Sequence, residues 1–135
     1  MYRILMALGL ALPLTQVPHP VRADTLAQAY EAASVALETE IFRASGRTHA
    51  DAARQAAWDN RRRAASLCAL AELERLRGRA AAERYVTAYA AASRKAKHAA
   101  TAGEIMGHIS EAHRAARLDL RKTLVPITQR CGIGL

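Results

Sequence analysis

The sequence contains few aromatic residues, only two cysteines and almost no proline beyond its first 20 residues. Aromatic residues make up 4% of the 135 residues, with one Trp and one Phe. A surface that stacks nucleic-acid bases needs several aromatic rings, so that class of binding protein is largely excluded. A chain of this length forms one domain at most, which excludes a multidomain enzyme.

The short motifs that mark common catalytic and cofactor sites are also missing. The chain has no Cys-x-x-Cys-His for covalent haem, no glycine-rich phosphate loop, no Gly-x-Ser-x-Gly and no His-Glu-x-x-His. Neighbouring acids such as Glu72 and Glu74 are two residues apart, so they point to different faces of a helix. We therefore predict a protein that is not an enzyme and that carries no cofactor.

The first 23 residues have the order of a secretory signal peptide. Arg3 precedes an apolar run over residues 4–14, and the segment ends with Val21-Arg22-Ala23, whose small residues fit a signal-peptidase site. The run is shorter than the roughly 20 apolar residues that span a bilayer. We predict a signal peptide over 1–23 and a single helical domain over 24–135, in a periplasmic or secreted protein. A buried N-terminal helix of a cytosolic protein is the alternative.

Large apolar side chains are scarce in the predicted mature chain. Leu, Ile, Val and Phe together account for 19 of the 112 residues after Ala23, whereas Ala accounts for 29. A fraction below roughly 20% combined with high net charge is typical of disorder. Alanine has the highest helix propensity and lets helices approach closely. The composition therefore predicts a thinly cored helical domain that needs a covalent staple or a partner.

The absence of proline between residues 24 and 125 and the helical spacing of the apolar residues predict an all-α fold. Capping residues and glycines divide the chain into about four helices with short connections, which indicates a small antiparallel bundle. In the fourth helix, Ile105, Ala112 and Leu120 share one stripe, so we expect Leu120 to face the core. The four expected helices cover residues 24–46, 48–78, 79–99 and 101–125.

The two cysteines, Cys68 and Cys131, match the number needed for one disulfide in an oxidising compartment. Such a bond closes a loop of about 60 residues, which stabilises the fold by roughly 3–4 kcal/mol. An intermolecular bridge is one alternative. A reactive thiol pair is another, because nearby cations lower the pKa of a cysteine. The corresponding alternative function is a thiol redox accessory.

Basic residues are concentrated in the later part of the chain. Residues 46–135 contain 17 basic and 8 acidic residues, whereas residues 24–43 contain one basic and four acidic residues. The densest basic run surrounds the single Trp: Arg54, Trp58, Arg61, Arg62 and Arg63. A tryptophan flanked by arginines is typical of contact hot spots. A core-edge Trp covered by arginine stems on a solvated face is the simpler alternative.

These observations lead to one main hypothesis. The protein is exported, is not an enzyme, and acts by binding another macromolecule through Arg54, Trp58 and Arg61–Arg63, as an accessory, chaperone-like or inhibitor or immunity-type protein. The expected partner is a protein or an anionic envelope component. Nucleic acid is not expected, because no recognition motif is present, and neither is a membrane span. A homo-oligomer is compatible with the composition.

A second hypothesis concerns metal binding. Glu104, His108 and Glu111 are spaced i, i+4 and i+7, which places them on one helix face. A row of two carboxylates and an imidazole can ligate a divalent transition metal. An ordinary solvated helix face has the same composition. The alternative function is a metal-binding or metal-sensing helical bundle in the envelope.

Overall fold

The computed structural model describes residues 21–135, with side chains from Thr25 onward. Residues 1–20 of the predicted signal peptide, which include its charge and apolar run, lie outside the described residues. The described chain is all-helical, as predicted, and has six α-helices and one π-helix, η1. Their bounds are α1 Val21–Ala44, α2 His49–Ala56, α3 Asn60–Arg77, α4 Arg79–Ala96, α5 Ala102–Ala115, η1 Leu120–Leu124 and α6 Val125–Cys131.

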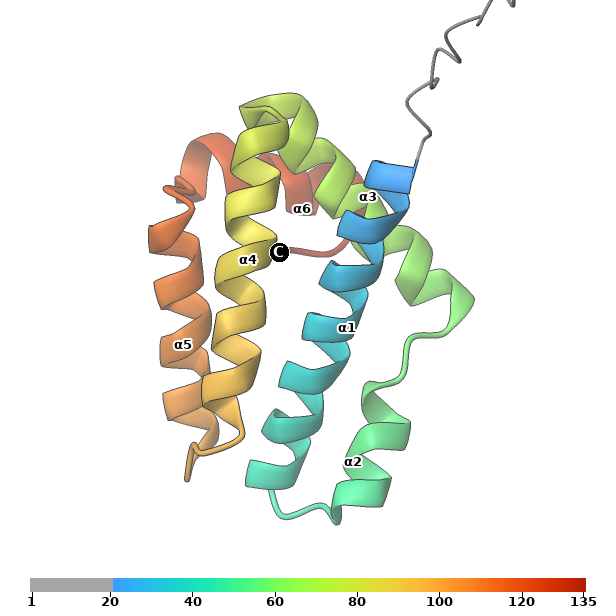
Figure 1. The fold of residues 1–135 in the computed structure, drawn as a ribbon, viewed down its shortest axis with the longest axis vertical. Coiled ribbons are helices and arrows are strands. Elements are labelled where there is room, and N and C mark those ends of the chain that lie inside the picture. Colours follow the sequence, from blue (N-terminus) through green and yellow to red (C-terminus); the bar gives the residue numbers. More distant parts are fainter. Residues whose placement is uncertain (1–20) are drawn as a thin grey trace, which may run out of the picture.

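The helices α1, α4 and α5 lie side by side with α4 in the middle (Figure 1). The helices α4 and α5 are antiparallel, but α1 and α4 run in the same direction (Figure 1). Between α1 and α4, the chain forms α2, which lies beside the end of α1, and then α3, which packs on α4 and α6. The arrangement is therefore a helical bundle with more helices than predicted and with a parallel pair at its centre.

The expected long helix over residues 48–78 is wrong, because the chain is broken between α2 and α3. Ala57 has an extended backbone, with ψ 135°, and the Asp59 carboxylate caps α3 by accepting the Arg62 N–H at 2.7 Å. Between them, Trp58 packs its ring edge-on against Tyr30, with 5.8 Å between the centroids. Burial of this large side chain and a new helix cap together stabilise the break.

The expected helix over residues 101–125 is also wrong in its second half. α5 ends where Arg117 adopts a left-handed backbone with φ 55°, and the Leu118 N–H bonds back to the His113 carbonyl at 3.0 Å. This is the hydrogen-bond pattern that commonly closes helices. The turn rotates the following residues, so Leu120 is 65% exposed and does not join the core.

The core is built mainly from alanine, as the composition predicts. Eleven of the 21 buried hydrophobic residues are alanines. The largest fully buried apolar or aromatic side chains are Leu37, Leu73, Tyr85, Ile105 and Ile127. Small side chains let helix axes approach closely, but each contributes little apolar area. The aromatic rings of Tyr30, Tyr85 and Tyr89 supply much of the remaining volume, with neighbouring centroids 5.3–6.1 Å apart.

The predicted disulfide between Cys68 and Cys131 is confirmed within the chain, with 5.7 Å between the Cα atoms. It joins the middle of α3 to the last residue of α6. Beyond it, Ile133 and Leu135 pack against the core, and the Leu135 carbonyl lies 3.1 Å from the His113 Nε2. Burial lowers the pKa of His113, so the neutral ring is favoured and its Nε2–H can donate to this carbonyl. The disulfide therefore anchors α6 and the C-terminal tail.

Candidate binding surface

The predicted contact residues around Trp58 are divided between the core and the surface. Trp58 itself is 8% exposed and belongs to the core, so its indole is not available as an exposed hot spot. Arg54 is paired with Asp51 within α2. Of the arginine run, Arg61 is exposed and has no partner among residues 25–135.

Arg62 and Arg63 hold α3 against α1. Arg62 forms an ion pair with Glu38, and Arg63 donates from both its Nε and Nη2 to the Glu31 carboxylate. Burial raises the pKa of the Glu38 carboxyl, an effect that Arg62 opposes. The hydrogen bond from Arg63 lowers the pKa of Glu31. These two arginines therefore have a structural role, which is to hold α3 against α1.

This difference within one arginine run gives a stability prediction. Arg62→Ala leaves the half-buried Glu38 without its partner, so we expect the free energy of unfolding to fall by about 1–3 kcal/mol. Arg61→Ala removes the same charge from an exposed position and is expected to change it by less than about 0.5 kcal/mol. Urea unfolding followed by circular dichroism measures both. Equal losses would contradict the structural role of the Arg62–Glu38 pair.

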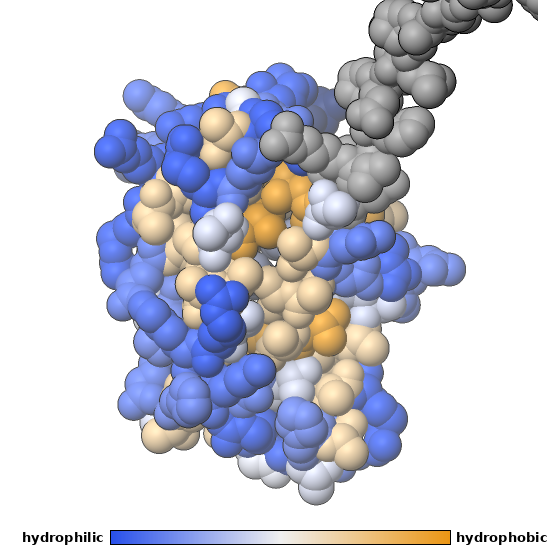
Figure 2. Space-filling view, viewed as in Figure 1, coloured by the Kyte–Doolittle hydropathy of each residue, from blue (hydrophilic) through white to orange (hydrophobic). Residues whose placement is uncertain are grey.

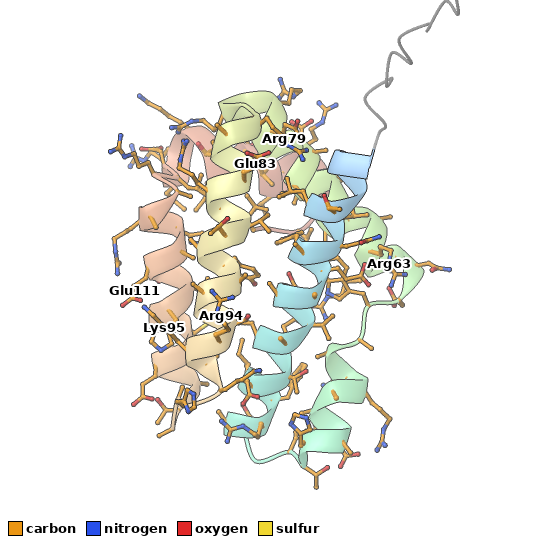
Figure 3. All side chains as sticks on the ribbon, viewed as in Figure 1. Arg63, Arg79, Glu83, Arg94, Lys95 and Glu111 are labelled. Carbon is orange, nitrogen blue, oxygen red and sulfur yellow. A yellow bond between two sulfur atoms is a disulfide. The ribbon has the colours of Figure 1, made fainter. Side chains whose placement is uncertain are left out.

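The three candidate metal ligands do not form a ligand set. The Glu104 carboxylate accepts the Ala100 N–H at 2.8 Å and caps α5. The Glu111 carboxylate lies 3.0 Å from the Lys95 Nζ (Figure 3). It also lies 3.5 Å from the His108 Nδ1. The contacts with Lys95 and then His108 lower the pKa of Glu111. All three candidates line one shallow pocket at the end of α4 and the start of α5, but no group of three potential ligands able to hold a metal ion occurs in the described chain.

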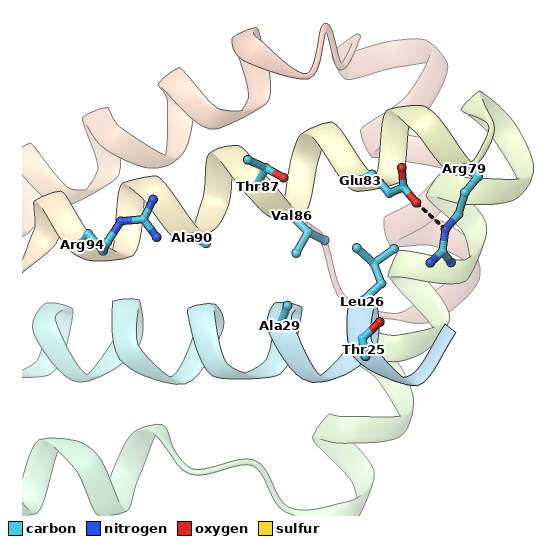
Figure 4. Close-up of a pocket in the computed structure, with 9 residues that line it drawn as sticks. All are labelled: Thr25, Leu26, Ala29, Arg79, Glu83, Val86, Thr87, Ala90 and Arg94. Atoms are coloured by element: carbon cyan, nitrogen blue, oxygen red, sulfur yellow. Dashed lines mark hydrogen bonds and ion pairs between the residues drawn. The ribbon is translucent and has the colours of Figure 1, made fainter. Parts of the chain in front are cut away.

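Two of the shallow grooves that flank α4 have partly apolar walls. One, of about 400 Å³, lies between α1 and α4 and has Leu26 and Val86 in its wall, the Arg79–Glu83 ion pair at one end and Arg94 at the other (Figure 4). The other, of about 500 Å³, lies between α4 and α5 and is lined largely by alanines, with Arg84 on its rim. Apolar colour runs down the middle of this face, with polar residues on either side (Figure 2). These grooves provide contact area beside α4.

Cations that lack a carboxylate partner gather at the end of α5 and in η1. Arg114, Arg117, Arg121 and Lys122 lie within nine residues, and none forms an ion pair with another described residue. Arg84 joins them, because it lines the α4–α5 groove together with Ala115. We call the five residues Arg84, Arg114, Arg117, Arg121 and Lys122 the basic corner. Asp119 is the one acid within this segment, and its carboxylate accepts the Lys122 N–H at 2.7 Å.

The basic corner was not among the candidate residues chosen from the sequence. Its signal was present as four cations and one acid over residues 114–122. The assignment of these residues to a continuous helix, with Leu120 directed at the core, made the segment look like an ordinary amphipathic helix. The denser run at Arg61–Arg63 looked stronger, but ion pairs with α1 neutralise much of it.

Comparison of the chain with protein-family models, with curated proteins and with solved structures gives no match. No helix in the part of the chain that the structure describes combines the length and apolar character needed to cross a bilayer. The disulfide is consistent with an oxidising location outside the cytoplasm.

Proposed function

We propose that this is a non-enzymatic binding protein of the periplasm or extracellular space, and that it binds an anionic macromolecule through the basic corner. The observation that carries the proposal is the collection of five exposed cations at one end of the molecule, none of them neutralised by a described carboxylate. Unpaired surface cations steer and hold anionic partners.

The alternatives have less support. The described cysteines are both in the disulfide that anchors α6, so a thiol redox role requires breaking a structural bond. A metal role lacks a ligand set. The predicted surface around Trp58 stays a hypothesis for its exposed Arg54 and Arg61, but it no longer includes an accessible aromatic anchor.

A pair of charge-matched double variants tests the basic corner. We expect Arg114→Gln with Arg121→Gln to weaken binding to immobilised poly-L-glutamate by about tenfold or more at low salt, because each lost contact removes about 1 kcal/mol. The control, Arg47→Gln with Lys97→Gln, removes the same charge from two exposed, unpaired positions, one between α1 and α2 and one directly after α4. It is expected to change the dissociation constant by less than about twofold.

Surface plasmon resonance at several salt concentrations measures both variants. Equal weakening by the two double variants would show that net charge alone controls binding and would remove the basic corner as a site. Unchanged unfolding midpoints establish that both variants keep the fold.

A further inference from the structure

Two exposed apolar side chains sit beside the basic corner. Leu120 is 65% and Val125 39% exposed, and they are among the three large hydrophobic residues exposed in the described chain. The Val125 N–H bonds to the Leu120 carbonyl across the π-helical turn. This hydrogen bond joins the two residues across one turn, and both side chains are exposed. We call these two residues the apolar turn.

Cations flank the apolar turn along the chain. Arg117 precedes Leu120, and Arg121 and Lys122 follow it. All three are exposed. An apolar tip with cations around it is the pattern of protein segments that lie in the interface of an anionic membrane.

Arg117 occupies a backbone position that normally favours glycine. Its φ of 55° lies in the left-handed region, where a residue with a Cβ is disfavoured by roughly fivefold or more in the folding equilibrium. Glycine is the common residue at this position of a helix end. An arginine at this position lowers the stability of the folded protein, and backbone strain of this kind concentrates at functional sites.

The turn is held rigidly by its buried side. Thr123 and Ile127 are fully buried, and the Arg77 Nη1 donates to the Thr123 Oγ1 at 3.4 Å. The disulfide at Cys131 fixes the end of α6 to α3. The apolar turn is therefore presented in one orientation, which reduces the entropy lost on binding.

We infer that the anionic partner is a phospholipid surface, with the apolar turn inserted between headgroups and the basic corner on the phosphates. This inference rests on the proposed function. Four of the five cations are arginines, whose planar guanidinium groups match phosphate oxygens in pairs. An acidic protein would need an apolar pocket to receive the protruding Leu120, whereas a fluid bilayer accepts it without one. Two apolar side chains give weak, reversible, peripheral binding.

Sedimentation with lipid vesicles tests the inference, using the full chain and vesicles of phosphatidylcholine with or without phosphatidylglycerol. We expect binding only when phosphatidylglycerol is present, and loss of binding as salt shortens the Debye length from about 10 Å at 0.1 M to about 3 Å at 1 M. Leu120→Ser should weaken binding by about tenfold. Arg117→Gly should weaken it by about fivefold, while its unfolding midpoint stays the same or rises because the strain is relieved.

Two controls match these variants in chemistry but lie at the other end of the molecule. Met106→Ser removes an apolar side chain that is 54% exposed near the start of α5, and Arg47→Ala removes an exposed cation between α1 and α2. Neither should change vesicle binding. Absence of binding to phosphatidylglycerol vesicles, or unchanged binding by Leu120→Ser, overturns the lipid inference. If the basic-corner double variant still loses affinity for poly-L-glutamate in that case, the proposed function stands with a protein as the partner.

Discussion

Replacing both Cys68 and Cys131 by serine is expected to lower the free energy of unfolding by about 4 kcal/mol. The two cysteines are 63 residues apart in sequence, so the crosslink removes many conformations from the unfolded chain. The core offers little compensation, since more than half of its buried hydrophobic residues are alanines. A domain of this size is stable by only about 5–10 kcal/mol, so the variant should melt about 15–20 °C lower.

Thermal and urea unfolding of the native protein with and without dithiothreitol provides the control for this variant. Reduction of the native protein should cause the same loss as the double serine substitution, which separates the crosslink from the polarity of serine. A double variant within about 1 kcal/mol of the native protein would contradict the structural role of the bond. It would also return support to the thiol redox alternative.

The features of the fold that were predicted correctly have local causes. Thr48 and Thr101 cap α2 and α5 by accepting the N–H groups of Asp51 and Glu104, and both caps are visible as short sequence patterns. The disulfide followed from cysteine number and the signal-like N-terminus. The all-α class followed from alanine content and the lack of proline. Each of these properties depends on neighbouring residues or on composition.

The features that were missed depend on tertiary contacts. No proline or glycine marks the break before α3. Ala57 adopts the extended backbone there, and Trp58 packs in the core against Tyr30. The end of α5 likewise lacks a glycine, since Arg117 takes the left-handed position. A helical pattern that continues through such points cannot reveal a break whose stabilising contacts come from a distant helix.

The candidate site shows the same limit. Cation density predicted Arg61–Arg63, but the sequence could not show that α1 would bring Glu31 and Glu38 against Arg63 and Arg62. Binding capacity at a surface depends on which charges stay unpaired after folding. That property emerges only when acidic and basic helices have been placed together, which is why the basic corner appeared from the structure.

Trp58→Ala is expected to lower the free energy of unfolding by about 3–5 kcal/mol, because it empties a large buried volume beside Tyr30. This loss distinguishes a core residue from a contact residue. Substitution of a surface hot-spot residue would weaken the binding of the partner while the unfolding midpoint stayed nearly unchanged. Urea unfolding followed by far-UV circular dichroism makes the comparison.

Trp58→Phe is the matched control. It keeps an aromatic ring in the core and removes the indole Nε1, which is buried and has no partner among the described side chains. We therefore expect the phenylalanine variant to retain most of the stability that alanine loses. If both substitutions left the unfolding midpoint unchanged, Trp58 would not be a core residue, and the surface with Arg54 and Arg61 would again be the leading candidate. If only alanine destabilises, any loss of partner binding by Trp58→Ala reflects unfolding, and the basic corner becomes the surface to test.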